Sequence, residues 1–142
     1  MAVILVSSCL LGIRCRYKGD SVLCERLLAL AKEHTLIPVC PEQMGGLPTP
    51  RNPSERVNDK VLSCTGADVT ENYRRGAEAA LYLAQLYRCD FAILKAYSPA
   101  CGKGIIYDGS FSGSRKPGNG VAAELLLNHG LPVFTDEEEW PL

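Results

Sequence analysis

Short apolar runs separated by helical patterns organise this chain. Four runs have the length and β-branched content of buried strands, at residues 2–6, 35–39, 91–94 and 132–134. Between them, apolar residues recur with helical spacing in segments that begin near residues 21, 68 and 121. Short strands alternating with helices are typical of a parallel sheet covered on both faces. We therefore predict an α/β fold: one three-layer domain, residues 1–142, with a short, mostly parallel, Rossmann-like sheet.

Local signals refine these elements. The first helix is expected from Ser21, with Leu23 and Leu27 on its apolar face. Asp68 and Glu71 have the spacing of a capping box ahead of the second helix. Residues 44–60 have loop composition, and residues 98–117 predict a long ordered loop that can contain a hairpin.

Charge and hydropathy narrow the class of partner. The net charge is −1, and no basic cluster predicts a stable nucleic-acid partner. The apolar runs are too short to span a bilayer, and no charged segment precedes the first one as in a signal peptide. We expect a cytoplasmic protein without a membrane partner, and the oligomeric state stays open.

The seven cysteines change this picture. Their number is odd, and the cytosol keeps thiols reduced, so a disulfide framework is not expected. Cys24 and Cys89 lie in or beside helical patterns and are interpreted as packing residues, while Cys64 has no assigned role.

Three other cysteines follow predicted strands. Cys9, Cys40 and Cys101 come after the first, second and third strand, so parallel strands would carry them to one sheet edge. Each alone is more often a small buried residue, whereas three together favour a shared metal site, and both interpretations stay open. No CxxC pair supports a zinc ribbon or a ferredoxin-type site. Cys15 lies in the same loop as Cys9 and is a possible fourth ligand.

Several motifs together resemble the thiouracil desulfurase family, formerly catalogued as a domain of unknown function. The similarity runs from Ser8 to about Gly120. The motifs are SCLLG at 8–12, RYKG at 16–19, CPE at 40–42, GLPTPR at 46–51, 95–102 around Cys101, and IYDG at 106–109. The family often has serine where Ala100 stands and an acidic residue where Lys18 stands.

The resemblance implies a cofactor and an activity. It implies a 4Fe-4S cluster bound by Cys9, Cys40 and Cys101, with one iron not bound by protein. That iron would take the sulfur of a thiolated pyrimidine base or nucleoside, and the reaction would give uracil and sulfide. An iron without a protein ligand can act as a Lewis acid in this non-redox C=S hydrolysis.

The same resemblance assigns catalytic roles to Glu42 and Ser98. Glu42 is suited to general acid–base work near Cys40, although a carboxylate after Pro41 also fits a helix start. Ser98 can contact the substrate or serve only the turn before Pro99. Arg16, Tyr17, Arg51 and Lys95 are predicted to line the substrate pocket, although surface ion pairs explain arginines equally well.

Two alternatives to a desulfurase stay open at this stage. One is a sulfur carrier or redox sensor that binds a cluster or metal without turnover. The other is a zinc hydrolase with cysteine ligands and Glu42.

Overall fold

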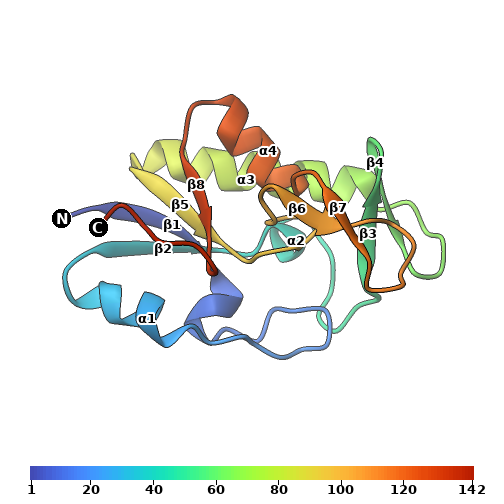
Figure 1. The fold of residues 1–142 in the computed structure, drawn as a ribbon, viewed down its shortest axis with the longest axis horizontal. Coiled ribbons are helices and arrows are strands. Elements are labelled where there is room, and N and C mark those ends of the chain that lie inside the picture. Colours follow the sequence, from blue (N-terminus) through green and yellow to red (C-terminus); the bar gives the residue numbers. More distant parts are fainter.

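A four-stranded parallel sheet forms the centre of the molecule. The computed structural model describes residues 1–142. The strand order is β2-β1-β5-β8, with β2 and β8 at the edges (Figure 1). Its strands are β1 (Val3–Ser7), β2 (Thr35–Val39), β5 (Phe91–Leu94) and β8 (Val133–Thr135). All four lie within one residue of their predicted positions, and the predicted α/β fold class is confirmed.

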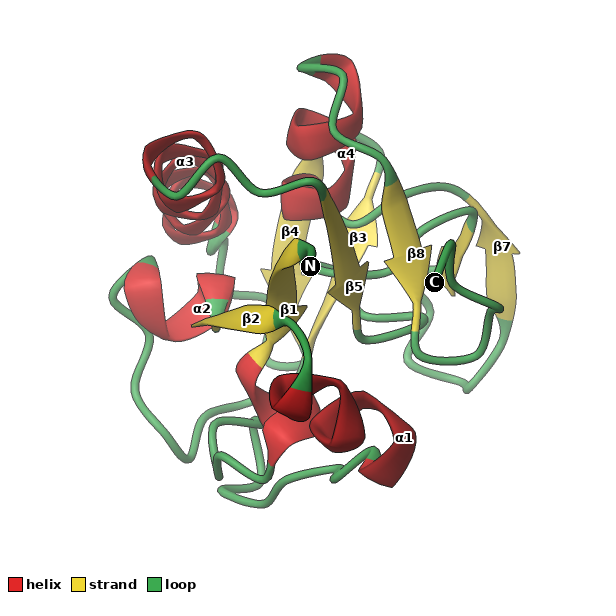
Figure 2. Ribbon diagram, turned by 90° about the vertical axis from the view of Figure 1, so that its left-hand side faces the viewer, coloured by secondary structure: helices red, strands yellow, loops and turns green.

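Helices cover both faces of this sheet. On one face lie the 3₁₀ turn η1 (Ser8–Leu11), α1 (Glu25–Leu28) and the 3₁₀ turn η2 (Ala29–Lys32). Figure 2 shows α3 (Thr70–Leu86) and α4 (Val121–Asn128) on the opposite face, and α2 (Pro41–Met44) is packed beside α3. None of the helices has the length and apolar character needed to cross a membrane.

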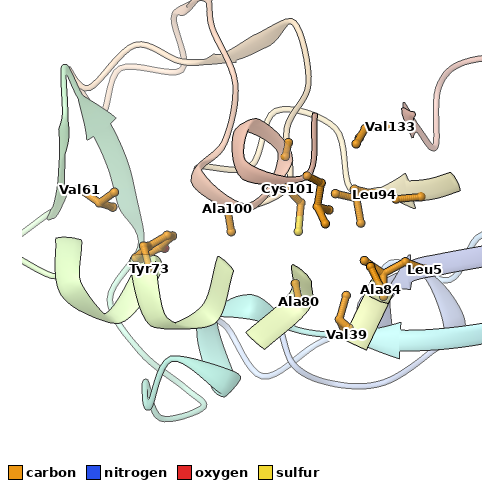
Figure 3. Close-up of a cluster of buried hydrophobic side chains, with 13 residues drawn as sticks. Leu5, Val39, Val61, Tyr73, Ala80, Ala84, Leu94, Ala100, Cys101 and Val133 are labelled. Atoms are coloured by element: carbon orange, nitrogen blue, oxygen red, sulfur yellow. The ribbon is translucent and has the colours of Figure 1, made fainter. Parts of the chain in front are cut away.

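Alternation along the strands divides the core in two. Ile4, Val6 and Ile93 are buried with Leu10 and Leu27 on the α1 side. Leu5, Ala92 and Leu94 face the other way and pack with α3 and α4, in the cluster drawn in Figure 3. Because successive strand residues point to opposite faces, one continuous apolar run supplies both layers.

Two antiparallel hairpins extend beyond the sheet. They are β3 (Ser54–Val57) with β4 (Lys60–Ser63), and β6 (Ile105–Tyr107) with β7 (Arg115–Pro117). The second hairpin was predicted within the long loop 98–117. The first overlaps residues 44–60, so the prediction of loop structure throughout that segment was wrong at its end: Glu55 pairs with Leu62 across an antiparallel ladder.

Three local predictions were also wrong. The expected helix from Ser21 begins only at Glu25, because Val22 and Cys24 donate backbone hydrogen bonds to the carbonyls of Cys9 and Leu10. No capping box forms at α3, since Asp68 accepts the N–H of Thr70. The second strand is largely half-exposed rather than buried, because β2 is an edge strand.

Two glycines let α2 approach α3 closely. A Cβ added at Gly76 would lie 1.7 Å from the carbonyl oxygen of Pro41, and one at Gly45 would lie 1.9 Å from that of Asn72. Helix α2 begins immediately after Cys40, so this contact also positions that cysteine.

Gly76→Ala is therefore expected to destabilise the protein. In an exposed helix this change would stabilise by roughly 0.5–1 kcal/mol, but the clash with Pro41 should instead cost about 1–3 kcal/mol. Urea unfolding measures the difference, with the exposed neighbour Arg75→Ala as control. A Gly76→Ala variant as stable as the wild type would contradict the close contact.

Candidate functional site

A cavity of about 430 Å³ opens at the carboxyl edge of the sheet. The register places Ser7 at the end of β1 beside Val39 at the end of β2, and β5 runs parallel to β1, so the following loops leave the sheet on the same side. All nine residues predicted for the site line this cavity: Cys9, Arg16, Tyr17, Cys40, Glu42, Arg51, Lys95, Ser98 and Cys101. The sheet thus brings together segments that are about 90 residues apart in sequence.

Four free thiols face this cavity. Cys9 lies in η1, Cys40 precedes α2, and Cys101 lies in the loop after β5. Cys15 also lines the cavity and is 2% exposed. Cys24, Cys64 and Cys89 are not among the lining residues, and Cys24 and Cys89 pack against the core, as the sequence predicted.

The thiols are close enough to influence one another. Hydrogen bonding with Cys40 lowers the pKa of Cys15, but its contact with Cys9 and its burial outweigh this and raise the pKa to about 11. The contact with Cys15, followed by burial, raises the pKa of Cys40. Burial raises the pKa of Cys101 to about 12. In the metal-free chain these three thiols therefore hold their protons at neutral pH, and metal binding must release them.

This arrangement suits a cluster better than a single ion. Nowhere do three His, Cys, Asp or Glu side chains form a group that could hold one metal ion. A single zinc requires ligands gathered at about 2.0–2.3 Å from one centre, whereas a multi-iron cluster places its thiolates farther apart. Several thiols around one roomy cavity fit the ligand set of an iron–sulfur cluster.

Glu42 and Arg51 form a largely buried ion pair beside the thiols. Arg51 Nε and Nη2 lie 2.8 and 2.6 Å from Glu42 Oε2, and the side chains are 7% and 17% exposed for Arg51 and Glu42. The guanidinium also donates to Pro48 O, Thr49 Oγ1 and Cys15 O. Through these four hydrogen bonds and the ion pair, Arg51 orients Glu42 and the Cys15 loop.

Ser98 fixes the turn that carries Cys101. Its Oγ accepts the backbone N–H groups of Ala100 and Cys101 at 3.1 and 3.0 Å. The predicted turn role is therefore present, but Ser98 also lines the cavity, and its hydroxyl proton is not used in these two bonds. Ala100 belongs to the buried cluster of Figure 3 and is not among the residues that line the cavity.

Positive charge lies at the rim. Lys95 Nζ is 3.7 Å from Asp136 Oδ2, and Arg16 Nη1 is 3.1 Å from Asp20 Oδ2. The guanidinium of Arg16 and the ammonium of Lys18 each lie 5.7 Å from the centre of the Tyr17 ring. The structure thus brings Arg16, Tyr17 and Lys95 to the cavity wall.

Comparisons with known proteins identify the family. A family model described as 2-thiouracil desulfurase matches residues 4–138. The chain belongs to the 2-thiouracil desulfurase family. The family predicted from the sequence motifs is confirmed, and so is the predicted class of enzyme, a desulfurase.

Relatives of this desulfurase family match nearly the whole chain. An uncharacterized protein of Bacillus subtilis (strain 168), YbbK, is 41% identical over 146 residues, covering 96% of this chain and 97% of YbbK. A solved structure of a 4Fe-4S-dependent thiouracil desulfidase, TudS, is 45% identical with a TM-score of 0.90. That alignment covers 95% of this chain and 91% of TudS.

The desulfurase cavity also contains residues that the sequence did not single out. Ser7, Glu55, Tyr73, Tyr107 and Phe111 line it as well. Tyr107 lies in the IYDG motif at 106–109, whereas Glu55 lies in a segment that the sequence predicted to be a loop. Residues 54–57 are Ser-Glu-Arg-Val, with a single apolar residue, so no alternation of polar and apolar positions indicated a strand there.

Arg51→Met is expected to destabilise this desulfurase fold by about 3–5 kcal/mol, because it leaves the Glu42 carboxylate unpaired in a buried place. Arg16→Met is the matched control, since the Arg16 and Asp20 side chains are 31% and 48% exposed and loss of their ion pair should cost about 0–1 kcal/mol. Urea unfolding of the cluster-free protein measures both. Equal losses for the two variants would argue against a structural role for the Glu42–Arg51 pair.

Proposed function

We propose that this chain binds a 4Fe-4S cluster through Cys9, Cys40 and Cys101 and removes sulfur from thiolated pyrimidine bases or nucleosides. The observation that carries the proposal is the convergence of these three thiols on one cavity in a member of this family. The similarity to TudS, described as 4Fe-4S-dependent and as a thiouracil desulfidase, supports both the cofactor and the substrate class.

Three protein thiolates would leave one iron of the cluster without a protein ligand. Cys9 and Cys40 lie within two residues of a strand end, and Cys101 lies in the loop after β5, in a turn that Ser98 fixes. The Cys15 carbonyl is 2.9 Å from Arg51 Nη2 and 3.8 Å from Cys40 Sγ, so its backbone has a structural task of its own. We infer that Cys15 packs against the ligands rather than binding iron.

The reaction exchanges a C=S bond for a C=O bond with water as the second substrate, without a change in oxidation state. The cluster would supply a Lewis-acidic iron to the thiocarbonyl sulfur. Glu42 would accept a proton from the attacking water as general base, because its side chain lines the cavity beside the thiols and is oriented by Arg51. Its Oε2 is paired with Arg51. Ser98, whose Oγ accepts two backbone N–H groups, would donate a hydrogen bond from its hydroxyl to the substrate.

The cavity suits a flat, polar ring. Its volume of about 430 Å³ lies within the range of about 300–1,000 Å³ typical of small-molecule sites. Tyr17, Tyr107 and Phe111 offer aromatic surface, while Arg16 and Lys95 at the rim offer donors for an exocyclic oxygen.

Anaerobic reconstitution followed by sulfide assays tests the proposal. We expect four irons per chain and sulfide release from at least one of 2-thiouracil, 4-thiouracil and their nucleosides. Glu42→Gln should retain the cluster and lose about 10²–10⁴-fold in rate, because it cannot accept the proton. Glu78→Gln, on an exposed part of α3, is the control. Failure to bind a cluster would refute the proposal, and a cluster without sulfide release would favour the carrier or sensor.

Serine substitutions test the ligand set. Cys15→Ser is expected to retain iron content and visible absorption, whereas Cys40→Ser should lose the cluster because it removes a soft ligand. Iron analysis and absorption of both variants, reconstituted in parallel, make the comparison. Loss of the cluster in Cys15→Ser would mean four protein ligands and no open iron.

A further inference from the structure

Glu55 in β3 is a buried carboxylate without a cationic partner. It is 9% exposed, and no lysine, arginine or histidine forms an ion pair with it. Its neighbour Arg56 is paired with Glu124, 2.6 Å away. Burying a charge in this way is costly unless strong donors reach it, so its hydrogen bonds must account for its place.

One oxygen of Glu55 holds a loop. Oε1 accepts the backbone N–H of Gly109 at 2.9 Å and that of Phe111 at 3.1 Å. These residues lie in the connection between β6 and β7, residues 108–114, here called the hairpin loop. Figure 1 shows the β6–β7 hairpin beside β3. The second oxygen, Oε2, makes no hydrogen bond within the protein, and Glu55 lines the cavity.

The hairpin loop is held in a conformation that its residues disfavour. Phe111 has φ +56°, which is unusual for a bulky side chain. At Gly109, with φ +95°, an added Cβ would lie 2.8 Å from Val57 Cγ2, so the loop is pressed against β3. In this conformation Phe111 remains 39% exposed while lining the cavity. A strained backbone that keeps a large ring in contact with a cavity indicates a use for that ring.

We propose that Glu55 and the hairpin loop form the subsite that recognises the pyrimidine ring. Oε2 accepts a ring N–H, and Phe111 stacks on the face of the ring. The inference rests on the proposed function and deepens it, because it assigns recognition of the base to residues away from the thiols. An ionised carboxylate is purely an acceptor, and uracil and its thio-analogues each carry ring N–H donors that match it.

Glu55→Gln separates recognition from loop support. The glutamine carbonyl can still accept the two loop N–H groups, but its amide nitrogen replaces the free acceptor with a donor. Calorimetry with uracil and anaerobic cluster-loaded protein should show a dissociation constant raised about tenfold or more. The visible spectrum and the urea midpoint should stay close to those of wild type.

Methylated ligands identify the hydrogen bond itself. In the wild type, either 1-methyluracil or 3-methyluracil should bind more weakly than uracil, depending on which N–H reaches Glu55. In Glu55→Gln the penalty for that methyl group should largely disappear, since the bond is already lost and the two changes are not additive. Equal methylation penalties in wild type and Glu55→Gln would overturn the role of Oε2.

Two substitutions test whether the aromatic ring of Phe111 stacks on the ligand. Phe111→Leu should weaken uracil binding about tenfold, whereas Phe111→Tyr should retain it, because stacking requires an aromatic face. Tyr82→Leu, on the exposed side of α3, is the control for loss of an aromatic ring and should bind as the wild type does. Unchanged binding by Phe111→Leu would refute the stacking contact.

These results are independent of turnover because uracil has no C=S bond. Wild-type protein that binds uracil with the expected variant pattern but releases no sulfide would refute the proposed function and leave the subsite standing. If the wild type releases sulfide from thiouracil but the variants change neither uracil binding nor KM, the subsite would be refuted and the proposed function would stand.

Discussion

Parallel pairing of β1 with both β2 and β5 is the constraint on which the site depends. Parallel strands deliver their carboxyl ends to one edge, so η1, the Cys40 turn and the Cys101 loop all leave the sheet there. The chain crosses over to opposite faces on either side of β1, with α1 on one side and α3 on the other (Figure 2). This reversal opens a crevice between neighbouring loops, the usual place for ligands in such sheets.

Close packing behind the crevice holds it open and in shape. Gly76 lets α2 approach α3, and the N–H groups around Cys101 are satisfied by Ser98. Every deeply buried side-chain nitrogen and oxygen has a hydrogen-bond partner. Because the polar groups around the cavity have hydrogen-bond partners, the buried thiols and carboxylates are held in fixed positions. A cofactor site requires such fixed positions.

The cavity contains two buried carboxylates, and their partners in the protein differ. Glu42 is paired with Arg51 near the thiols, whereas Glu55 is held only by backbone N–H groups near Phe111. Oε2 of Glu42 pairs with Arg51, and Oε1 of Glu55 accepts the N–H groups of Gly109 and Phe111. The proposed chemistry and the proposed base recognition therefore use different carboxylates, which lets one substrate be bound and hydrolysed in the same small space.

The sequence by itself determined the strands, the fold class, the family and nine residues of the cavity wall, because buried strands and strand-end cysteines leave strong local patterns. It did not show that residues 21–24 are extended or that residues 54–57 pair with β4, since long-range hydrogen bonds decide both. Nor could it show that Arg51 is engaged by Glu42, or that Glu55 meets the hairpin loop 54 residues further along the chain. Only the tertiary structure decided those contacts, because side chains far apart in sequence meet only where the backbone brings them together.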